Sequence, residues 1–255
     1  ENIIDFDMVV CHINHMIRPE ADSEEEFVKE FCEKLNVEFY SKRIEVEKYA
    51  NNNKIGLEEA GRKIRYEFFE EILKKTGSNK IAVAHNKNDK VETIIMNILR
   101  GSGISGLQGI QPQTNNKIIR PIIEIERKDI EKYCEDKRLN PRIDKSNFDN
   151  TYTRNKIRNI VIPYIKQEFN PNIIETVTRL SEVITEENIF LNELTENEYQ
   201  TILTQKSNKE IVLDLKKFNK LDNIIKKRII LYTVSELRGS SKGIEKIHIE
   251  DIVKL

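Results

Sequence analysis

Residues 84–110 read AHNKNDKVETIIMNILRGSGISGLQGI, a strand end followed by a helix and a glycine-rich turn. The run just before it, 80–85, is short and apolar, as is typical of a buried strand. Apolar residues at helical spacing then predict a helix over 89–99. Asp89 and Glu92 lie three residues apart at its start, so they share one face of that helix.

The alternation of strand and helix continues on both sides of this stretch. Further strand-like runs are predicted at 7–13, 37–46 and 117–125, and further helices at 23–35, 57–73 and 127–137. Such alternation predicts an α/β fold with a mainly parallel, doubly wound sheet. Ligands of these sheets bind beyond the carboxyl ends of the strands, where the sequence places His12, Asn14, His15 and His85.

The alternation ends near residue 139. Residues 139–152 are rich in Asn, Asp and Ser and predict a loop. Beyond it we expect a short strand at 211–215 and helices at 154–169 (apart from Pro163), 173–203, 221–237 and 247–255. The predicted organisation is therefore a first domain over 1–168 and a smaller, mostly helical domain over 169–255.

The composition of the chain excludes several classes of protein. The longest apolar runs fall short of the roughly 20 residues that a membrane helix needs. Three scattered cysteines (Cys11, Cys32 and Cys134) with no C-x-x-C pair argue against a disulfide scaffold or a zinc site and favour the cytoplasm. A net charge of −1 over 255 residues hides a basic centre, since residues 61–169 hold 22 basic and 14 acidic side chains. Phosphate-bearing partners respond to such local charge.

Two readings stay open for the central stretch. Asp89 and Glu92 suit a catalytic or metal-binding role, but acidic residues in a first helical turn also stabilise the helix dipole. Arg100 and Gly101 follow the helix, where the glycines either form a C-cap or let backbone N–H groups approach a phosphate.

Other candidate residues are basic or amidic. Arg120 is either a phosphate contact or a solvated surface arginine. Arg154, Asn155 and Arg158 cluster where bidentate arginine contacts to phosphate are expected, or else form a solvated helix start. For His12 and His15 we prefer contact with substrate or RNA to zinc, because no third Cys or His lies nearby.

Together these segments resemble the tRNA(Ile)-lysidine synthases. HINHMIRPEAD (12–22) is similar to the family signature HxNHxLRxxAD, and GLEEAGRKIRYEFF (56–69) to its E-x-x-A-R-x-x-R-Y-x-F element. Residues 84–110 resemble AHHxDDxxET…LRGSGxxGLxGI, and 118–134 and 144–165 resemble later blocks. The resemblance covers roughly residues 8–185.

The resemblance implies a Rossmann-like N-type ATP pyrophosphatase fold and an ATP-dependent ligase. ATP, with Mg²⁺, adenylates the C2 oxygen of the wobble cytidine in an isoleucine tRNA with a CAU anticodon. The amine of free L-lysine then attacks C2 and releases AMP. The oligomeric state is left open, a homodimer included.

The resemblance also implies roles for particular side chains. Asp89 would be the active-site carboxylate and a Mg²⁺ contact, supported by Glu92, with Arg154 and Arg158 on phosphates. Nucleotide binding would involve His12, Asn14, His85, Arg100 and Gly101. Contacts to tRNA would involve His15, Arg18, Arg62, Arg65, Arg120 and Asn155.

The chain departs from the family pattern in three places. The HHxDD element reads His85-Asn86-Lys87-Asn88-Asp89, and Gly61 stands where an alanine-type neighbour of Arg62 is expected. No Ser-Gly-Gly-x-Asp-Ser phosphate loop occurs in the 255 residues, so we expect that loop and its strand upstream of Glu1. Two alternatives therefore stay open, a tRNA thiolation enzyme of the same superfamily and a non-catalytic RNA-binding fragment.

Overall fold

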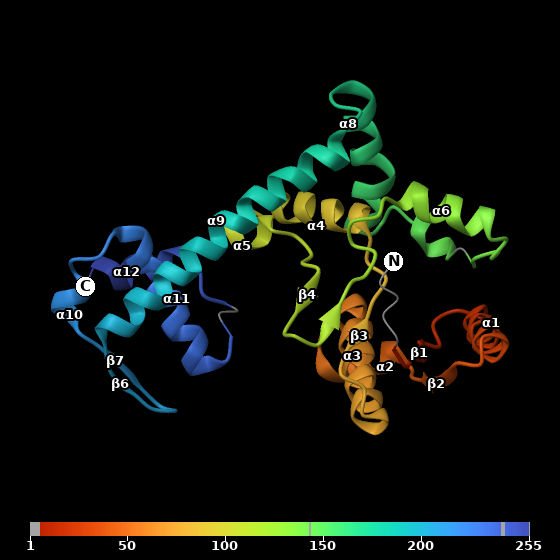
Figure 1. The fold of residues 1–255 in the computed structure, drawn as a ribbon, viewed down its shortest axis with the longest axis horizontal. Helices are drawn as coiled ribbons and strands as arrows, with labels where there is room; N and C mark the ends of the chain where they lie inside the picture. Colours follow the sequence, from red (N-terminus) through yellow and green to blue (C-terminus); the bar gives the residue numbers. More distant parts are fainter. Residues whose placement is uncertain (1–5, 143, 241–242, 255) are drawn as a thin grey trace. The chain divides into compact units, whose positions relative to one another are not determined.

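The computed structural model describes residues 6–142, 144–240 and 243–254 of a mixed α/β chain (Figure 1). It divides into two compact units, Glu1–Lys90 with Gln111–Thr151 and Val91–Ile110 with Tyr152–Leu255. The division falls inside one helix, α4 (Lys87–Leu99). The predicted functional division at residue 168 remains a prediction.

The first unit holds the predicted strand–helix alternation. Its elements, besides the start of α4, are β1 (Val9–Asn14), α1 (Ala21–Lys34), β2 (Glu38–Arg43), α2 (Val46–Asn53), α3 (Leu57–Thr76), β3 (Ile81–Ala82), β4 (Gln113–Thr114), β5 (Ile118–Ile119), α6 (Arg127–Asp136) and a 3₁₀ turn, η1 (Lys145–Phe148).

Parallel pairing in this unit confirms the expected βαβ connection. β1 pairs with β2 in parallel, from Val9 opposite Glu38 to Asn14 opposite Arg43, and α1 makes the crossover between them. The helix predicted at 57–73 is confirmed as α3, which ends at Gly77 with φ +70°. Val46, Ala50, Ala60 and Ile64 form the core between α2 and α3.

One sequence expectation for this unit is wrong, and one helix was not predicted. Only Ile118–Ile119 of the run predicted as extended at 117–125 pairs as a strand, in parallel with β3 and antiparallel to β4. Backbone turns follow, since Ile123 N–H donates to the Arg120 carbonyl at 3.1 Å. Helix α2 was not predicted, because only Val46 and Ala50 of its eight residues are buried and its apolar periodicity is weak.

The second unit is almost entirely helical. After the end of α4 it contains α5 (Ile104–Leu107), α7 (Thr153–Lys156), a π-helical segment η2 (Ile157–Val161), α8 (Ile162–Glu168), α9 (Ile173–Ile202), the antiparallel pair β6 (Leu203–Lys206) and β7 (Ile211–Leu213), α10 (Leu215–Phe218), α11 (Asn223–Arg238) and α12 (Lys246–Lys254). The helices predicted at 173–203, 221–237 and 247–255 are thereby confirmed within the described residues; Leu255 lies outside them.

Two apolar cores hold this unit together. One joins α4 to η2 and α9 through Val91, Ile94, Ile157 and Ile174, and the other centres on Tyr199, Ile202 and Ile229. The expected break at Pro163 is wrong, because the helix continues through it. Proline follows a π-helical segment here and occupies the first turn of α8, where its missing N–H is tolerated.

None of the described helices is long and apolar enough to cross a membrane.

Gly61 offers a test of packing around α3. A Cβ at this buried helical position would lie 3.7 Å from His15 Cε1 and 3.9 Å from Val46 Cγ1, which are ordinary contacts. We expect Gly61→Ala to raise the free energy of unfolding by about 1 kcal/mol, since alanine loses less backbone entropy than glycine in a helix.

The matched control is Gly106→Ala, where the new Cβ would lie 2.5 Å from Ser102 Cβ. The free energy of unfolding of this variant is expected to fall by about 1–3 kcal/mol. Urea denaturation measures both variants, and a destabilised Gly61→Ala would contradict the packing described for α3.

Candidate functional site

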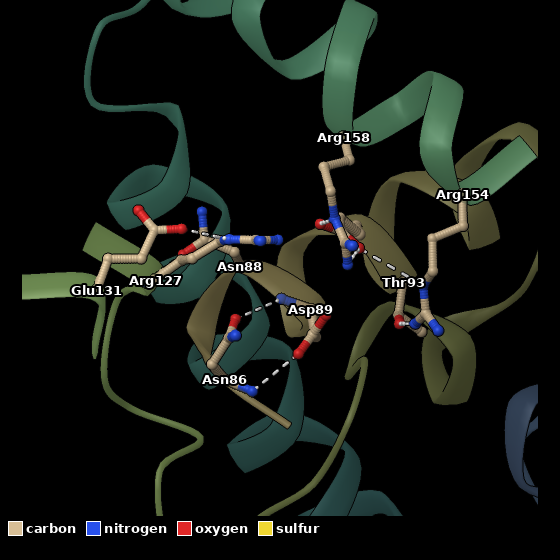
Figure 2. A network of polar contacts seen from close by, with 9 residues as sticks. Asn86, Asn88, Asp89, Thr93, Arg127, Glu131, Arg154 and Arg158 are labelled. Carbon is tan, nitrogen blue, oxygen red and sulfur yellow. Dashed lines mark hydrogen bonds and ion pairs between the residues drawn. The ribbon is translucent and has the colours of Figure 1, made fainter. Parts of the chain in front are cut away.

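Asn86 and Asp89 cap the N-terminus of α4 reciprocally. The Asn86 N–H donates to Asp89 Oδ2 at 3.0 Å, and the Asp89 N–H donates to Asn86 Oδ1 at 3.1 Å (Figure 2). Asn88 accepts the Arg127 N–H at 2.9 Å and so holds the start of α6. Asp89 therefore stabilises the start of α4, which is one of the two roles that the sequence left open. This capping box also fixes the direction of its carboxylate.

Glu92, one turn along the helix, is 1% exposed and binds arginine in the second unit. Arg158 Nε and Nη2 donate to Glu92 Oε1 at 2.6 Å and Oε2 at 2.8 Å, a bidentate pair. Arg154 Nε lies 3.5 Å from Glu92 Oε2, and Arg154 Nη2 donates to Thr93 Oγ1 at 2.8 Å (Figure 2).

Two arginines share the one carboxylate of Glu92. Their guanidinium groups both lie within ion-pair distance of it. The arginine side chains keep 33% and 21% exposure for Arg154 and Arg158, whereas neighbouring Asn155 is buried. Such a cluster attracts an anion while the buried carboxylate holds the arginines in place.

Arg120 is 7% exposed, so the expectation of a solvated surface arginine is wrong. Its Nη1 donates to the Gln111 carbonyl at 2.6 Å and to Thr114 Oγ1 at 2.9 Å, and its Nε donates to His85 Nδ1 at 3.3 Å.

Asn14 organises the end of β1. It is 1% exposed, donates through Nδ2 to Asp22 Oδ1 at 2.8 Å and Glu25 Oε2 at 3.1 Å, and accepts the Met16 N–H at 3.0 Å. Arg18, further along the loop, forms ion pairs with Glu24 and Asp144. These contacts fix the course of the loop after β1.

His12, in β1, and His15, just after it, both have a pKa below that of a free histidine. Burial lowers the pKa of His12, opposed in part by Glu25 and Glu24. Burial, then Arg65, His12 and Arg18, lowers the pKa of His15. Among the described residues no group of three His, Cys, Asp or Glu could hold a metal ion, and His15 Nδ1 is buried without a hydrogen-bond partner.

The remaining predicted residues lie at the ends and faces of helices. Arg62 and Arg65 are exposed on α3, with Arg62 stacked 5.4 Å from the Tyr66 ring. Arg100 is exposed, and Gly101 has φ +69°. The Gly101 N–H donates to the Ile98 carbonyl and the Ser102 N–H to the Asn97 carbonyl, so the glycine forms a Schellman C-cap of α4.

Sequence reasoning missed several residues of these networks. The capping role of Asn86 could have been predicted, because an Asn followed three residues later by an acidic residue is typical of a helix start. Thr93, Gln111 and Thr114 carry no such signal, since only the fold brings them to Arg154 and Arg120.

Comparison with known proteins places the chain in a family. The PP-loop domain family matches residues 2–165, and the chain belongs to it. A solved structure, the U34-tRNA thiolase NcsA from Methanococcus maripaludis with its [4Fe-4S] cluster, superposes with a TM-score of 0.56 over 72% of this chain and 64% of that one. At 15% identity this likeness shows the fold alone.

More specific similarity is to proteins named tRNA(Ile)-lysidine synthase. The protein of Clostridium acetobutylicum is 46% identical over 97% of this chain and 54% of its own length. Those of Clostridioides difficile and Caldanaerobacter subterraneus are 41% and 43% identical, over 54% and 53% of their lengths. The chain thus spans about half the length of the curated relatives it matches.

The Glu92 cluster predicts an asymmetric response to mutation. Arg158→Met should lower the free energy of unfolding by about 3 kcal/mol, because it leaves a buried carboxylate short of its main partner. The double variant Glu92→Gln/Arg158→Met should recover most of that loss, since the buried carboxylate is gone and the remaining cation, Arg154, is one-third exposed to water.

Lys156→Met, an exposed change on the same helix, should stay within about 0.5 kcal/mol of the wild type. Urea denaturation of the four proteins gives the comparison, and a double variant no more stable than Arg158→Met would refute this account.

Glu25 predicts a pH dependence of stability. It is 8% exposed; burial alone would raise its pKa, but hydrogen bonds from Asn14, Ser41 and Arg43 outweigh burial and lower the pKa below 4.5. A carboxylate with a lowered folded-state pKa stabilises the fold above its unfolded pKa and loses that contribution as pH falls.

We therefore expect Glu25→Gln to lower the free energy of unfolding by about 2 kcal/mol at pH 7. The difference from wild type should narrow as pH falls below the ordinary value of 4.5. Glu26→Gln, at an exposed neighbouring position, is the control and should show no such narrowing. A constant Glu25→Gln difference from pH 7 to pH 3 would contradict the prediction.

Proposed function

We propose that the protein is an ATP-dependent ligase that joins lysine to C2 of the wobble cytidine of an isoleucine tRNA with a CAU anticodon. The observation that carries this proposal is the 46% identity with a tRNA(Ile)-lysidine synthase over 97% of the chain. The C2 oxygen attacks the α-phosphate of ATP and expels pyrophosphate. The lysine amine then attacks C2, loses a proton and expels AMP.

The arginines of the Glu92 cluster suit the phosphate part of this chemistry. Negative charge develops on the α-phosphate and on leaving pyrophosphate, and preorganised cations stabilise it. Arg154 and Arg158 supply the cations, and their contacts to Glu92 and Thr93 hold them before substrate binds. Glu92 therefore acts through the arginines rather than on the substrate.

Asp89 suits a Mg²⁺ contact. This ion is usually bound by one or two carboxylates together with substrate phosphates, so a single fixed carboxylate fits it better than a dedicated cage. When bound, Mg²⁺ would neutralise phosphate charge. The capping bonds of Asp89 to Asn86 set the direction of its carboxylate.

The remaining residues fall into two groups in this proposal. His12, His15, His85, Arg18, Arg62, Arg65 and Arg100 contact nucleotide or tRNA directly. Asn14, Gly101, Arg120 and Asn155 act by holding the backbone and neighbouring side chains, because protein contacts bury Asn14, Arg120 and Asn155 and Gly101 forms a cap.

The finer fold and setting belong to the same proposal. A doubly wound, mainly parallel sheet is supported by the parallel pairs β1–β2 and β3–β5 and by the likeness to the thiolase fold. Residues 169–255 then serve as a tRNA-binding domain of a cytoplasmic enzyme, with a homodimer as the assembly to test.

The test uses the full-length protein with ATP, Mg²⁺, lysine and unmodified tRNA, followed by mass spectrometry of the wobble nucleoside. The expected product carries the mass of lysine less water. Asp89→Asn should abolish product yet fold normally, because the amide oxygen of Asn can still accept the Asn86 N–H.

Asp129→Asn, in the first turn of α6, is the matched control and should retain activity. A gain of sulfur in place of lysine would establish a thiolation enzyme, and tRNA binding without any mass gain would establish an RNA-binding module. Normal turnover by Asp89→Asn would remove that residue from the proposed site.

A further inference from the structure

The buried face of α9 changes in character along the helix. Near its start Ile174 and Val177 join one apolar core, and near its end Tyr199 and Ile202 join the other. The buried residues between these two ends are all polar: Thr178, Ser181, Asn188 and Thr195. A buried polar group lowers stability unless its hydrogen bonds are made, so the partners of this stretch indicate what it does.

The polar stretch of α9 lies beside the turn that follows α4. We call residues 100–109 the glycine turn; it contains the short helix α5, which contacts α9 within the second unit (Figure 1). Every residue of the turn is exposed or partly buried, and Gly101 and Gly109 near its ends have φ +69° and +64°. Because apolar burial contributes little here, the position of the turn depends on hydrogen bonds.

Three side chains from neighbouring helices anchor the glycine turn. Asn97 Nδ2, on α4, donates to the Gly106 carbonyl at 2.8 Å. On α9, Ser181 Oγ donates to the Gln108 carbonyl at 2.8 Å, and Asn188 Nδ2 donates to Gln108 Oε1 at 3.1 Å. Two of the three anchors therefore come from α9, and both of them hold Gln108.

Arg228, on α11, orients the amide of Asn188. Its Nη2 donates to Asn188 Oδ1 at 2.8 Å and to Asn192 Oδ1 at 2.6 Å. Since a guanidinium group only donates, the amide oxygen of Asn188 faces Arg228 and the amide nitrogen is left to face Gln108. Burial lowers the pKa of Arg228, as expected for a cation partly removed from water.

We propose that Asn188 is a positioning residue that holds the glycine turn in place for contact with ATP. The ligand of the turn rests on the proposed function, which assigns Arg100, at its start, to contact with nucleotide or tRNA. A turn without buried residues would otherwise be ordered only when the ligand binds, and that loss of conformational freedom weakens binding. Asn188 removes part of this cost before ATP arrives.

The experiment measures the affinity of the full-length protein for ATP with Mg²⁺ by isothermal titration calorimetry. Asn188→Ala and Gln108→Ala should each weaken ATP binding by about fivefold, which corresponds to the loss of one hydrogen bond. The double variant should bind no more weakly than either single variant, because both changes remove the same bond. Independent effects would instead multiply to about 25-fold.

Thr195→Ala is the matched control. Thr195 is also 4% exposed on α9, but its Oγ1 donates to the Leu191 carbonyl of the same helix at 2.6 Å. This variant loses a buried hydrogen bond that does not reach the glycine turn, so it should bind ATP like wild type.

Steady-state kinetics of lysidine formation separate positioning from folding. Asn188→Ala should raise the KM for ATP and leave the KM for lysine unchanged. A simple loss of folded protein would lower kcat and change neither KM.

Hydrogen exchange tests the anchoring without ATP. Backbone amides of residues 103–109 should exchange faster in Asn188→Ala than in wild type or in Thr195→Ala, because the turn has lost one of its three anchors.

Wild-type ATP affinity in Asn188→Ala would overturn the proposal. So would an equal loss of affinity in Thr195→Ala, or a double variant weakened by the full product of the single effects. If wild type binds no ATP while exchange still rises in Asn188→Ala, the proposed function fails and the anchoring of the turn stands. If lysidine forms and Asn188→Ala binds ATP normally, the role of Asn188 fails alone.

Discussion

The carboxylate of Glu92 is 1% exposed on α4, and a lone buried charge of this kind would be strongly unfavourable. Arg158 meets it with two hydrogen bonds and Arg154 adds a second cation, so α4 and the segment carrying both arginines are tied by charge as well as by the apolar contacts of Val91, Ile94 and Ile157. The position of the arginines therefore follows from the solvation requirement of one acidic side chain.

Other residues to which the sequence assigned a chemical role also make structural contacts. Asp89 caps α4 with Asn86, Gly101 ends it as a C-cap, and Arg120 joins His85 to the turn that carries Thr114. Structural and chemical roles are compatible here, because a side chain held by such contacts needs little reorganisation when substrate arrives. Asn86 and Asn88, where the chain departs from the HHxDD pattern, are both used in capping, which explains how the local fold tolerates the change.

Long periodic segments were predictable from sequence, and short ones were not. The helices α3 and α9 were predicted to within three residues at each end. Each contains 20 or 30 residues, so single residues that depart from the apolar periodicity do not obscure it. Helix α2 and the strands β4 and β6 were missed, since their lengths of eight, two and four residues carry too little pattern. Pro163 misled the prediction because the preceding π-helical segment, which accommodates it, has no sequence signature.

The sequence alone determined the residue types for phosphate chemistry, the alternation of the longer strands and helices, and the resemblance to a family of known reaction. These features depend on residue spacing and on sequence motifs, both of which can be recognised without the folded structure. Only the tertiary structure decided that Glu92 is buried, that Arg158 rather than Arg154 takes its bidentate contact, and that Arg120 faces inward. Those outcomes depend on partners 66 and 35 residues away in sequence, because burial and hydrogen bonding are properties of the packed chain.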